Sequence, residues 1–119
     1  MSYAVHIVRA DPCIANKFEP IPLTAWLEYV ASDHEMRLKG KAIFKSPKGE
    51  VIEINAPGLA EWIDPHDGSR AVFDHSRGRV SVGNPSRAAL TKMFQIAEKL
   101  NAIVRGDEGE HYDAEGNCR

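Results

Sequence analysis

The sequence predicts one α+β domain, in which one mostly antiparallel sheet carries two helices packed on one face. The chain has 119 residues, a usual size for a single domain with one hydrophobic core. Two segments repeat apolar residues at helical spacing, and a run of short alternating segments lies between them. Consecutive strands without intervening helices favour antiparallel pairing. The expected order is a strand, a helix, four to six short strands, a helix and a last strand.

The first elements are a strand and a helix. Residues 3–9 alternate apolar and polar side chains and predict a strand, and residues 13–21 predict a loop. Pro22 suits the first turn of a helix, where its missing N–H is not needed. We expect Asp33 to face away from the core. The apolar face of this helix comprises Leu23, Trp26, Leu27 and Val30.

The middle of the chain predicts strands joined by turns. Residues 41–45 and 50–55 flank a turn that contains Pro47 and Gly49, which predicts a hairpin. Residues 59–63 predict a short strand. Residues 71–75 and 79–82 predict a second hairpin.

The second helix has the strongest pattern in the sequence. Asn84 is expected as its N-cap, with Pro85 in the first turn. Asn101 suits a left-handed residue at its end, and residues 102–105 predict the last strand. We expect residues 1–113 to form the domain and residues 114–119 to form a flexible tail. The apolar stripe of the helix comprises Leu90, Met93, Phe94, Ile96, Ala97 and Leu100.

Composition excludes several classes of function. The net charge of −2 gives no overall attraction to nucleic acid or to anionic membranes. No segment has the ~20 apolar residues that a membrane span needs, and residues 1–9 do not form a signal peptide, so we expect a cytoplasmic protein. The histidines and cysteines have no metal-ligand spacing. We therefore expect no metal, no cofactor and no catalytic residues.

The C-terminal segment is the main candidate for a partner-binding site. Residues 101–119 contain five acidic and two basic residues. Two glycines give this segment freedom to form a shaped loop, and acidic side chains around a tyrosine could enter a basic cleft of another protein. Trp62 is expected to be half exposed and to anchor the same partner. The predicted contact residues are Asp107, Glu108, Glu110, Tyr112, Asp113 and Trp62.

A basic stretch at residues 37–48 allows two interpretations. It contains five basic and no acidic residues, as an RNA-binding or acidic-partner surface does. Lysines also protect an edge strand against unwanted pairing. We favour edge protection and do not expect nucleic-acid binding, because no aromatic residues stand ready to stack on bases.

The order of motifs resembles a family of small, largely uncharacterised bacterial proteins found beside contact-dependent or type VI secreted toxins, including those of the Rhs kind. These proteins are read as immunity proteins. The resemblance implies a cytoplasmic, noncatalytic protein that binds one cognate toxin domain and occludes its active site. It covers most of the chain and is most specific in Gly-Asp-x-Gly-Glu-x-Tyr (residues 106–112). The other motif residues are Trp26, Tyr29, Val30, Asp33, Trp62, Lys92, Met93, Ile96, Ala97, Leu100 and Ala102.

Two other functions stay open from the sequence. The first is a structural or regulatory module without a toxin partner, which forms a homodimer through an edge strand. The second is a small enzyme or ligand-binding protein with a cleft lined by Trp26, Trp62 and His75. Toxin neutralisation is the function that we favour, because the sequence shows no catalytic signature.

Overall fold

Nine strands and two helices form the structure, a computed structural model that describes residues 3–10, 18–107, 109–113 and 115. This confirms the predicted α+β class, and the order differs from the expected one by the short strand β2 before the first helix. The elements are β1 (Ala4–Ala10), β2 (Phe18–Glu19), α1 (Leu23–Ser32), β3 (Met36–Leu38), β4 (Lys41–Lys45), β5 (Val51–Asn55), β6 (Leu59–Ile63), β7 (Arg70–Ser76), β8 (Arg79–Gly83), α2 (Arg87–Lys99) and β9 (Ile103–Gly106).

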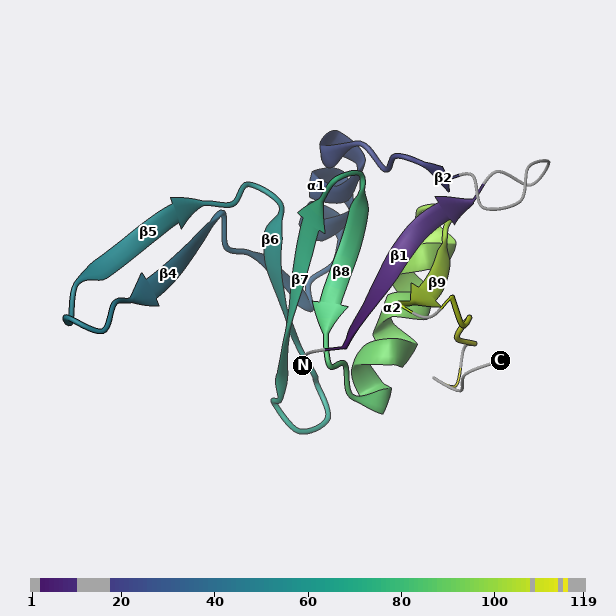
Figure 1. The fold of residues 1–119 in the computed structure, drawn as a ribbon. Coiled ribbons are helices and arrows are strands. Elements are labelled where there is room, and N and C mark those ends of the chain that lie inside the picture. The colour runs from purple at the N-terminus through teal and green to yellow at the C-terminus, as the bar shows by residue number, and fades with distance from the viewer. Residues whose placement is uncertain (1–2, 11–17, 108, 114, 116–119) are drawn as a thin grey trace.

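Seven of the strands form one antiparallel sheet, in the order β2-β1-β8-β7-β6-β3, with β9 also paired to β1 (Figure 1). The strand β1 is therefore internal, between β8 and β9, although it precedes the other strands in the chain. Its residue Ile7 lies opposite Val80 of β8 and opposite Val104 of β9. Because β3 ends the sheet at the other side, Arg37 of the basic stretch lies on an edge strand, and Lys39 follows the end of that strand.

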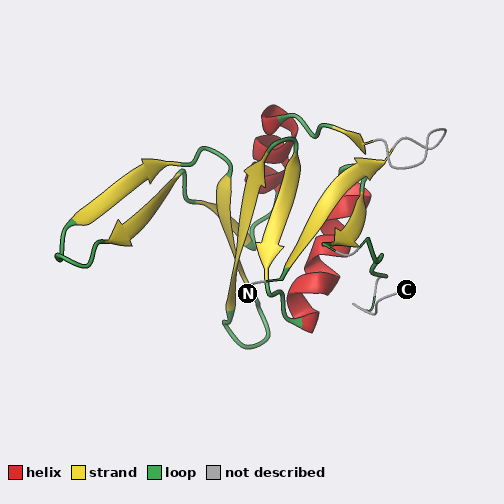
Figure 2. Ribbon diagram, viewed as in Figure 1, coloured by secondary structure: helices red, strands yellow, loops and turns green. Residues whose placement is uncertain are grey.

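One face of the sheet forms the hydrophobic core. Val5 and Ile7 of β1 are buried on this face, as are Val80 of β8 and Phe73 of β7. The alternation of these strands brings the apolar side chains to the same side, and both helices cover it (Figures 1 and 2). The opposite face of β1, β8 and β7 carries no helix, and on it Asp74 is exposed whereas His6 is buried.

The helices contribute large side chains to this core. Trp26 of α1 stacks between Tyr29 and Phe73, with ring centroids 6.1 and 6.3 Å apart. Its indole N–H donates to the Gly58 carbonyl at 2.9 Å, which satisfies the one polar atom of a buried ring. Met93 of α2 is fully buried beside them. Within the described part of the chain, no helix is long and apolar enough to cross a membrane.

The hairpin β4–β5 stands apart from the main sheet (Figure 2). Its strands pair with each other, as the sequence predicts, but with no other described strand, a separation from the main sheet that the sequence did not predict. The turn closes through a hydrogen bond from Ser46 N–H to the Glu50 carbonyl at 2.8 Å. Gly40 joins the hairpin to the sheet with a φ of +73°. We call β4, β5 and their turn the arm; it projects from a molecule that measures 49 × 33 × 31 Å.

The start of α2 differs from the expected one. Asn84 is not the N-cap: its φ is +45°, and its side chain accepts a hydrogen bond from Tyr3 N–H at 3.1 Å. Ser86 caps the helix instead, because its side chain accepts from Ala89 N–H at 3.1 Å. Asn101 adopts the predicted left-handed conformation with a φ of +53°.

A buried lysine joins the two helices. Lys92 of α2 is 5% exposed, and its ammonium donates to Asp33 at 2.6 Å and to Glu35 at 3.0 Å. Asp33 therefore does not face solvent, and the expectation that it points away from the core is wrong. Glu35 also accepts from the Trp62 indole N–H at 2.9 Å. The tryptophan is 5% exposed, so its expected half exposure is also wrong.

The same contacts shift the pKa values of the acidic side chains. Burial acts to raise the pKa of Asp33, but the hydrogen bonds from Lys92 and Tyr29 outweigh it and hold the pKa below its ordinary 3.8. The hydrogen bonds from Trp62 and Lys92 lower the pKa of Glu35 below its ordinary 4.5. Burial and the neighbouring Asp33 carboxylate raise the pKa of Tyr29. Both carboxylates are thus kept ionised opposite the lysine.

Replacement of Lys92 by Met should lower the free energy of unfolding near pH 7 by about 2–4 kcal/mol, because two partly buried carboxylates lose their counter-charge. Urea unfolding measures this loss. The control Lys99→Met removes an exposed lysine of the same helix and should change stability by less than about 0.5 kcal/mol. Equal losses in the two variants would contradict the role of Lys92.

Acid should remove the contribution of these carboxylates. In the folded protein the pKa values of Asp33 and Glu35 lie below the ordinary 3.8 and 4.5. The stabilisation is therefore complete at a pH above the ordinary pKa values, and it is lost as the pH falls through the pKa values of the folded protein. The Lys92→Met variant should therefore show a flatter loss of stability between about pH 5 and pH 2 than the original protein. Urea unfolding across this range tests the difference in slope.

Candidate functional site

The predicted acidic segment folds back beside β9. Gly106 N–H donates to the Glu110 carbonyl at 2.9 Å, and Gly109 N–H donates to the Gly106 carbonyl at 3.0 Å. The chain then returns along β9, where Tyr112 N–H donates to the Val104 carbonyl at 3.2 Å. Residues 106–112 therefore form a closed loop held against the sheet, which we call the C-terminal loop; Glu108 lies outside the described residues.

Asp107 fastens this loop to β1. Its carboxylate accepts from His6 Nε2 at 2.6 Å and from Ala4 N–H at 2.9 Å, so both oxygens have partners. Its own N–H donates to the Ala4 carbonyl at 3.2 Å. The hydrogen bond from His6 lowers the pKa of Asp107, followed by that from Ala4. The predicted contact residue is thus engaged within the fold.

His6 continues this chain of hydrogen bonds to Ser81 of β8, with its Nδ1 2.6 Å from the serine Oγ. A serine, a histidine and an aspartate in a row is the order of a nucleophile, its base and the group that orients the base. Ser81 lies in mid-strand, however, opposite His6 on one side and Asp74 on the other. The backbone N–H groups around it serve the sheet ladders and are not aimed at an oxyanion. We therefore infer that this row of hydrogen bonds fastens the C-terminal loop to the sheet.

The other predicted contact residues do not form one surface. Glu110 is half-buried, and the end of its side chain lies against Gly106, where a larger residue would push it aside. Tyr112 packs against the core cluster, and Asp113 is half-buried. Trp62 is buried on β6, which β1, β8 and β7 separate from β9 in the sheet. Asp107, Glu110, Tyr112 and Asp113 therefore lie in or next to the C-terminal loop, and Trp62 lies apart from them.

The cleft considered for a small ligand is not formed by the three predicted residues. Trp26 is buried in the core, while Trp62 lines a small cavity beside α2. His75 is half-buried, and its Nε2 lies 2.6 Å from the Ile21 carbonyl and so holds the segment that leads into α1. The three side chains therefore do not line one cleft.

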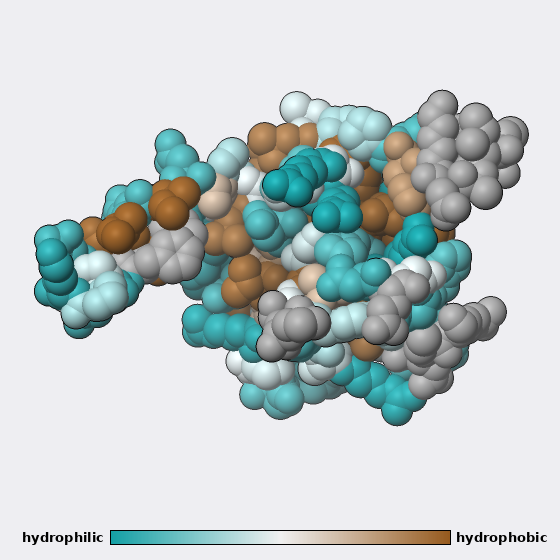
Figure 3. Space-filling model, in the orientation of Figure 1, coloured by the Kyte–Doolittle hydropathy of each residue, from teal (hydrophilic) through white to brown (hydrophobic). Residues whose placement is uncertain are grey.

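The arm carries four of the seven exposed large hydrophobic residues of the described chain. Ile43 is 63% exposed, Val51 66%, Ile52 45% and Ile54 51%. Figure 3 shows hydrophobic residues gathered along this projection, with hydrophilic ones between them. Large aliphatic side chains in this concentration on one element are typical of an interaction surface.

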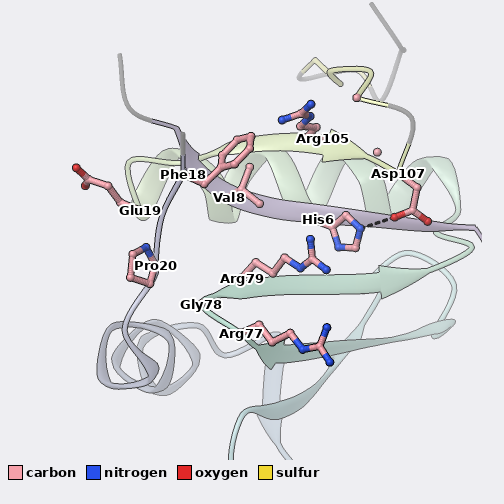
Figure 4. Close-up of a pocket in the computed structure, with 12 residues that line it drawn as sticks. His6, Val8, Phe18, Glu19, Pro20, Arg77, Gly78, Arg79, Arg105 and Asp107 are labelled. Carbon is pink, nitrogen blue, oxygen red and sulfur yellow. Dashed lines mark hydrogen bonds and ion pairs between the residues drawn. The ribbon is translucent and has the colours of Figure 1, made fainter. Parts of the chain in front are cut away.

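A second candidate surface lies at the opposite side of the main sheet, where β1, β2, the β7–β8 turn and the C-terminal loop meet (Figure 4). It encloses about 490 Å³. Phe18 and Arg105 lie on one side of β1, and Arg77 and Arg79 lie on the other (Figure 4). We call this surface the arginine cleft; its other lining residues are His6, Val8, Glu19, Pro20, Gly78, Gly106, Asp107 and Gly109.

The sequence did not indicate the cleft, because its cations come from separate segments. Arg77 and Arg79 flank the glycine of a hairpin turn, while Arg105 comes from the last strand. The two arginines on either side of Gly78 are the sequence feature that could have indicated the cleft. Among the described residues, no group of three or more His, Cys, Asp or Glu side chains could hold a metal ion.

Replacement of Asp107 by Ala should loosen the C-terminal loop without unfolding the sheet, because the loop loses its links to His6 and Ala4. Hydrogen exchange of the Ala4 and Gly106 amides should become faster. The matched variant Asp74→Ala removes an exposed carboxylate from the same face of the sheet and should leave both rates unchanged. Unaltered exchange in Asp107→Ala would contradict the fastening role.

Comparison of the chain with protein-family models, with curated proteins and with solved structures found no match. The residues of the candidate surfaces are therefore the basis for inferring their function.

Proposed function

We propose that this chain is a noncatalytic binding protein that holds a partner protein through its arm. The observation that carries the proposal is the exposure of four large aliphatic residues on a hairpin that touches no other strand of the described chain. Such residues favour burial by ~25 cal/mol for each Å² of apolar surface that leaves water. A partner that covers the arm would supply that burial.

The architecture of the arm supports this function. A two-stranded hairpin by itself is at best marginally stable in water. Here the register places Ile54 opposite Ala42 and Ile52 opposite Phe44, so apolar residue types face each other across the hairpin. On the alternate positions, Lys41 and Glu53 form an exposed ion pair at 3.8 Å. The arm therefore has one apolar side and one mixed side, as an element that docks by one side does.

Charge indicates the chemistry of the partner. The arm itself, residues 41–55, contains three basic and two acidic residues, a net charge of +1, and Arg37 and Lys39 just before it bring the net charge of residues 37–55 to +3. Two copies of the arm brought together by a two-fold axis would place like charges side by side, which disfavours an arm-to-arm homodimer. An apolar groove with an acidic rim on another protein fits both the isoleucines and the lysines.

Toxin neutralisation is the specific form of this function that the family resemblance implies, and it remains our proposal for the identity of the partner. The partner would be a cognate toxin domain, bound in the cytoplasm so that its active site is occluded. A positively charged arm does not mimic phosphate. On a toxin with a basic cleft, the arm would therefore bind beside the cleft and block access to it.

In the alternative mechanism, the acidic residues of the C-terminal segment enter a basic cleft of the toxin. Both oxygens of Asp107 are engaged with His6 and Ala4, so this carboxylate would have to break those bonds to contact a toxin. Glu110 and Asp113 are half-buried, and Glu115 is exposed. Electrostatic attraction by this end of the chain could still speed association without a direct contact.

The double variant Ile52→Asp/Ile54→Asp should abolish partner binding while the main sheet stays folded, because the arm packs on no other described strand. Affinity capture from the native cells, quantified by mass spectrometry, would compare it with the original protein and with Val72→Asp. The valine is equally exposed at 53% but lies on the main sheet, so its variant should keep the partner. Far-UV circular dichroism checks the fold of all three.

One protein recovered in stoichiometric amount by the original chain and by Val72→Asp, and lost in the arm variant, is the expected result. Rescue of cells that express that protein's toxin domain would then test neutralisation. Loss of the partner in both variants, or in neither, would count against the arm. Gel filtration that shows a dimer dissociated only by the arm variant would favour the homo-oligomer instead.

A further inference from the structure

We propose that the arginine cleft binds a small molecule that joins a phosphate monoester to a flat ring. This site is separate from the arm, because its lining comes from β1, β2, β9, the C-terminal loop and the β7–β8 turn and includes no residue of β4 or β5. Phosphate is the expected charged group because planar guanidinium groups bind it through paired N–H donors.

The cations of the cleft are available for a ligand. Within the described part of the chain, the side chains of Arg77 and Arg79 form no ion pair, and Arg79 acts on Asp107 through its charge, which helps to lower the pKa of that carboxyl group. Asp107, the nearest carboxylate of the loop, is already held by His6 and Ala4. Both nitrogens of His6 are also engaged, so the anion would be bound by arginines. A dianion would relieve the repulsion between neighbouring guanidinium groups.

The backbone at Arg77 supports a role for this side chain. Arg77 has a φ of +55° and Gly78 a φ of +77°, which is the pattern of a tight hairpin turn that favours Asn-Gly. An arginine at the first position is strained relative to asparagine. Strain of this kind is typical of functional sites, where a side chain has to be presented in a fixed direction.

The turn is also fastened to the wall of the cleft. Ile21 N–H donates to the Gly78 carbonyl at 2.7 Å, so the segment after β2 crosses the turn. A Cβ on Gly78 would lie 2.7 Å from Pro20 Cβ and 2.9 Å from Pro20 Cα. Only glycine therefore permits this close approach. The crossing fixes Arg77 and Arg79 relative to Phe18, which lies at the other end of the same segment.

Phe18 provides the surface for a flat ring. The Arg105 guanidinium lies 4.9 Å from the centroid of its ring, which is a cation–π contact. The ring is 40% exposed at the edge of the cleft, so part of it is open to stacking. A volume of about 490 Å³ lies within the range of small-molecule sites and fits a ring with one charged group.

Phenyl phosphate is the probe for this site, with inorganic phosphate and phenol as its two halves. In an NMR titration of the ¹⁵N-labelled full chain, phenyl phosphate should give saturable shifts of the amides of residues 77–79 and 105–107. Inorganic phosphate should bind the same amides more weakly, and phenol should not bind. Phe18→Ala should weaken phenyl phosphate binding and leave inorganic phosphate unaffected.

The double variant Arg77→Gln/Arg79→Gln should reduce the affinity for phenyl phosphate by about tenfold or more. Its matched control, Arg37→Gln/Lys45→Gln, removes the same number of charges from β3 and the arm and should keep full affinity. Equal losses in the two variants would show a nonspecific effect of net charge and overturn the proposal. Shifts that do not saturate with phenyl phosphate in the original chain would overturn it as well.

Arg77→Asn separates binding from folding. Because asparagine suits the left-handed conformation, this variant should have a higher melting temperature than the original chain and a lower affinity for phenyl phosphate. A lower melting temperature would contradict the strain at Arg77. A short single-stranded oligonucleotide without a terminal phosphate that binds these amides more tightly than phenyl phosphate would assign the cleft to nucleic acid instead.

Discussion

The ammonium group of Lys92 is the constraint on which the arrangement of the two helices depends. A buried cation must have counter-charges, and both of them come from the segment that leaves α1. Through Glu35 the contact also reaches Trp62 on β6. Helix α2 can therefore pack on the sheet only where its lysine meets the end of α1. The apolar core supplies most of the stabilisation, and the contacts of Lys92 determine how the two helices are placed relative to each other.

This placement of the helices also determines which surfaces are open. Both helices are on one face, so no helix covers the other face of β1, β7 and β8. The arginine cleft uses that open face at the side of β2 and β9. The arm leaves the sheet between β3 and β6, at the opposite side. The two surfaces share no residue, but the base of the arm is joined to β7 by the hydrogen bond from His75 N–H, two residues before Arg77, to the Gly58 carbonyl at 3.1 Å.

Local patterns in the sequence predicted the elements well and the contacts between distant elements poorly. Alternation located the strands, and Gly49 and Gly78 marked hairpin turns because their conformations are local properties. Asn84 misled the prediction of a helix start, since its side chain binds Tyr3 rather than the first turn. Lys92 lies three residues after Ala89 and four before Ile96, so it falls on the buried stripe of α2. A charged residue on the apolar stripe of a helix could have indicated a buried ion pair.

The candidate sites were harder to predict for the same physical reason. The acidic composition of the C-terminal loop was visible, but the bond from Asp107 to His6 spans 101 positions of the sequence. Nothing local indicates that this carboxylate is engaged. The arm was predicted as a hairpin, yet its separation from the sheet depends on the pairing of β3 with β6. The arginine cleft similarly requires the β7–β8 turn to meet β9.

The position of β1 between β8 and β9 has a consequence for synthesis on the ribosome. Val5 pairs with Val82 on one side and with Gly106 on the other, so the first strand made is the last to be enclosed. Until β9 leaves the exit tunnel, one side of β1 has bare backbone groups to which another strand could pair. The pairing of β1 with β9 also closes a long loop, whose entropy cost arises before the contacts between the two strands form, and this slows folding. The nascent chain is therefore most prone to aggregate after β8 has emerged and before β9 has.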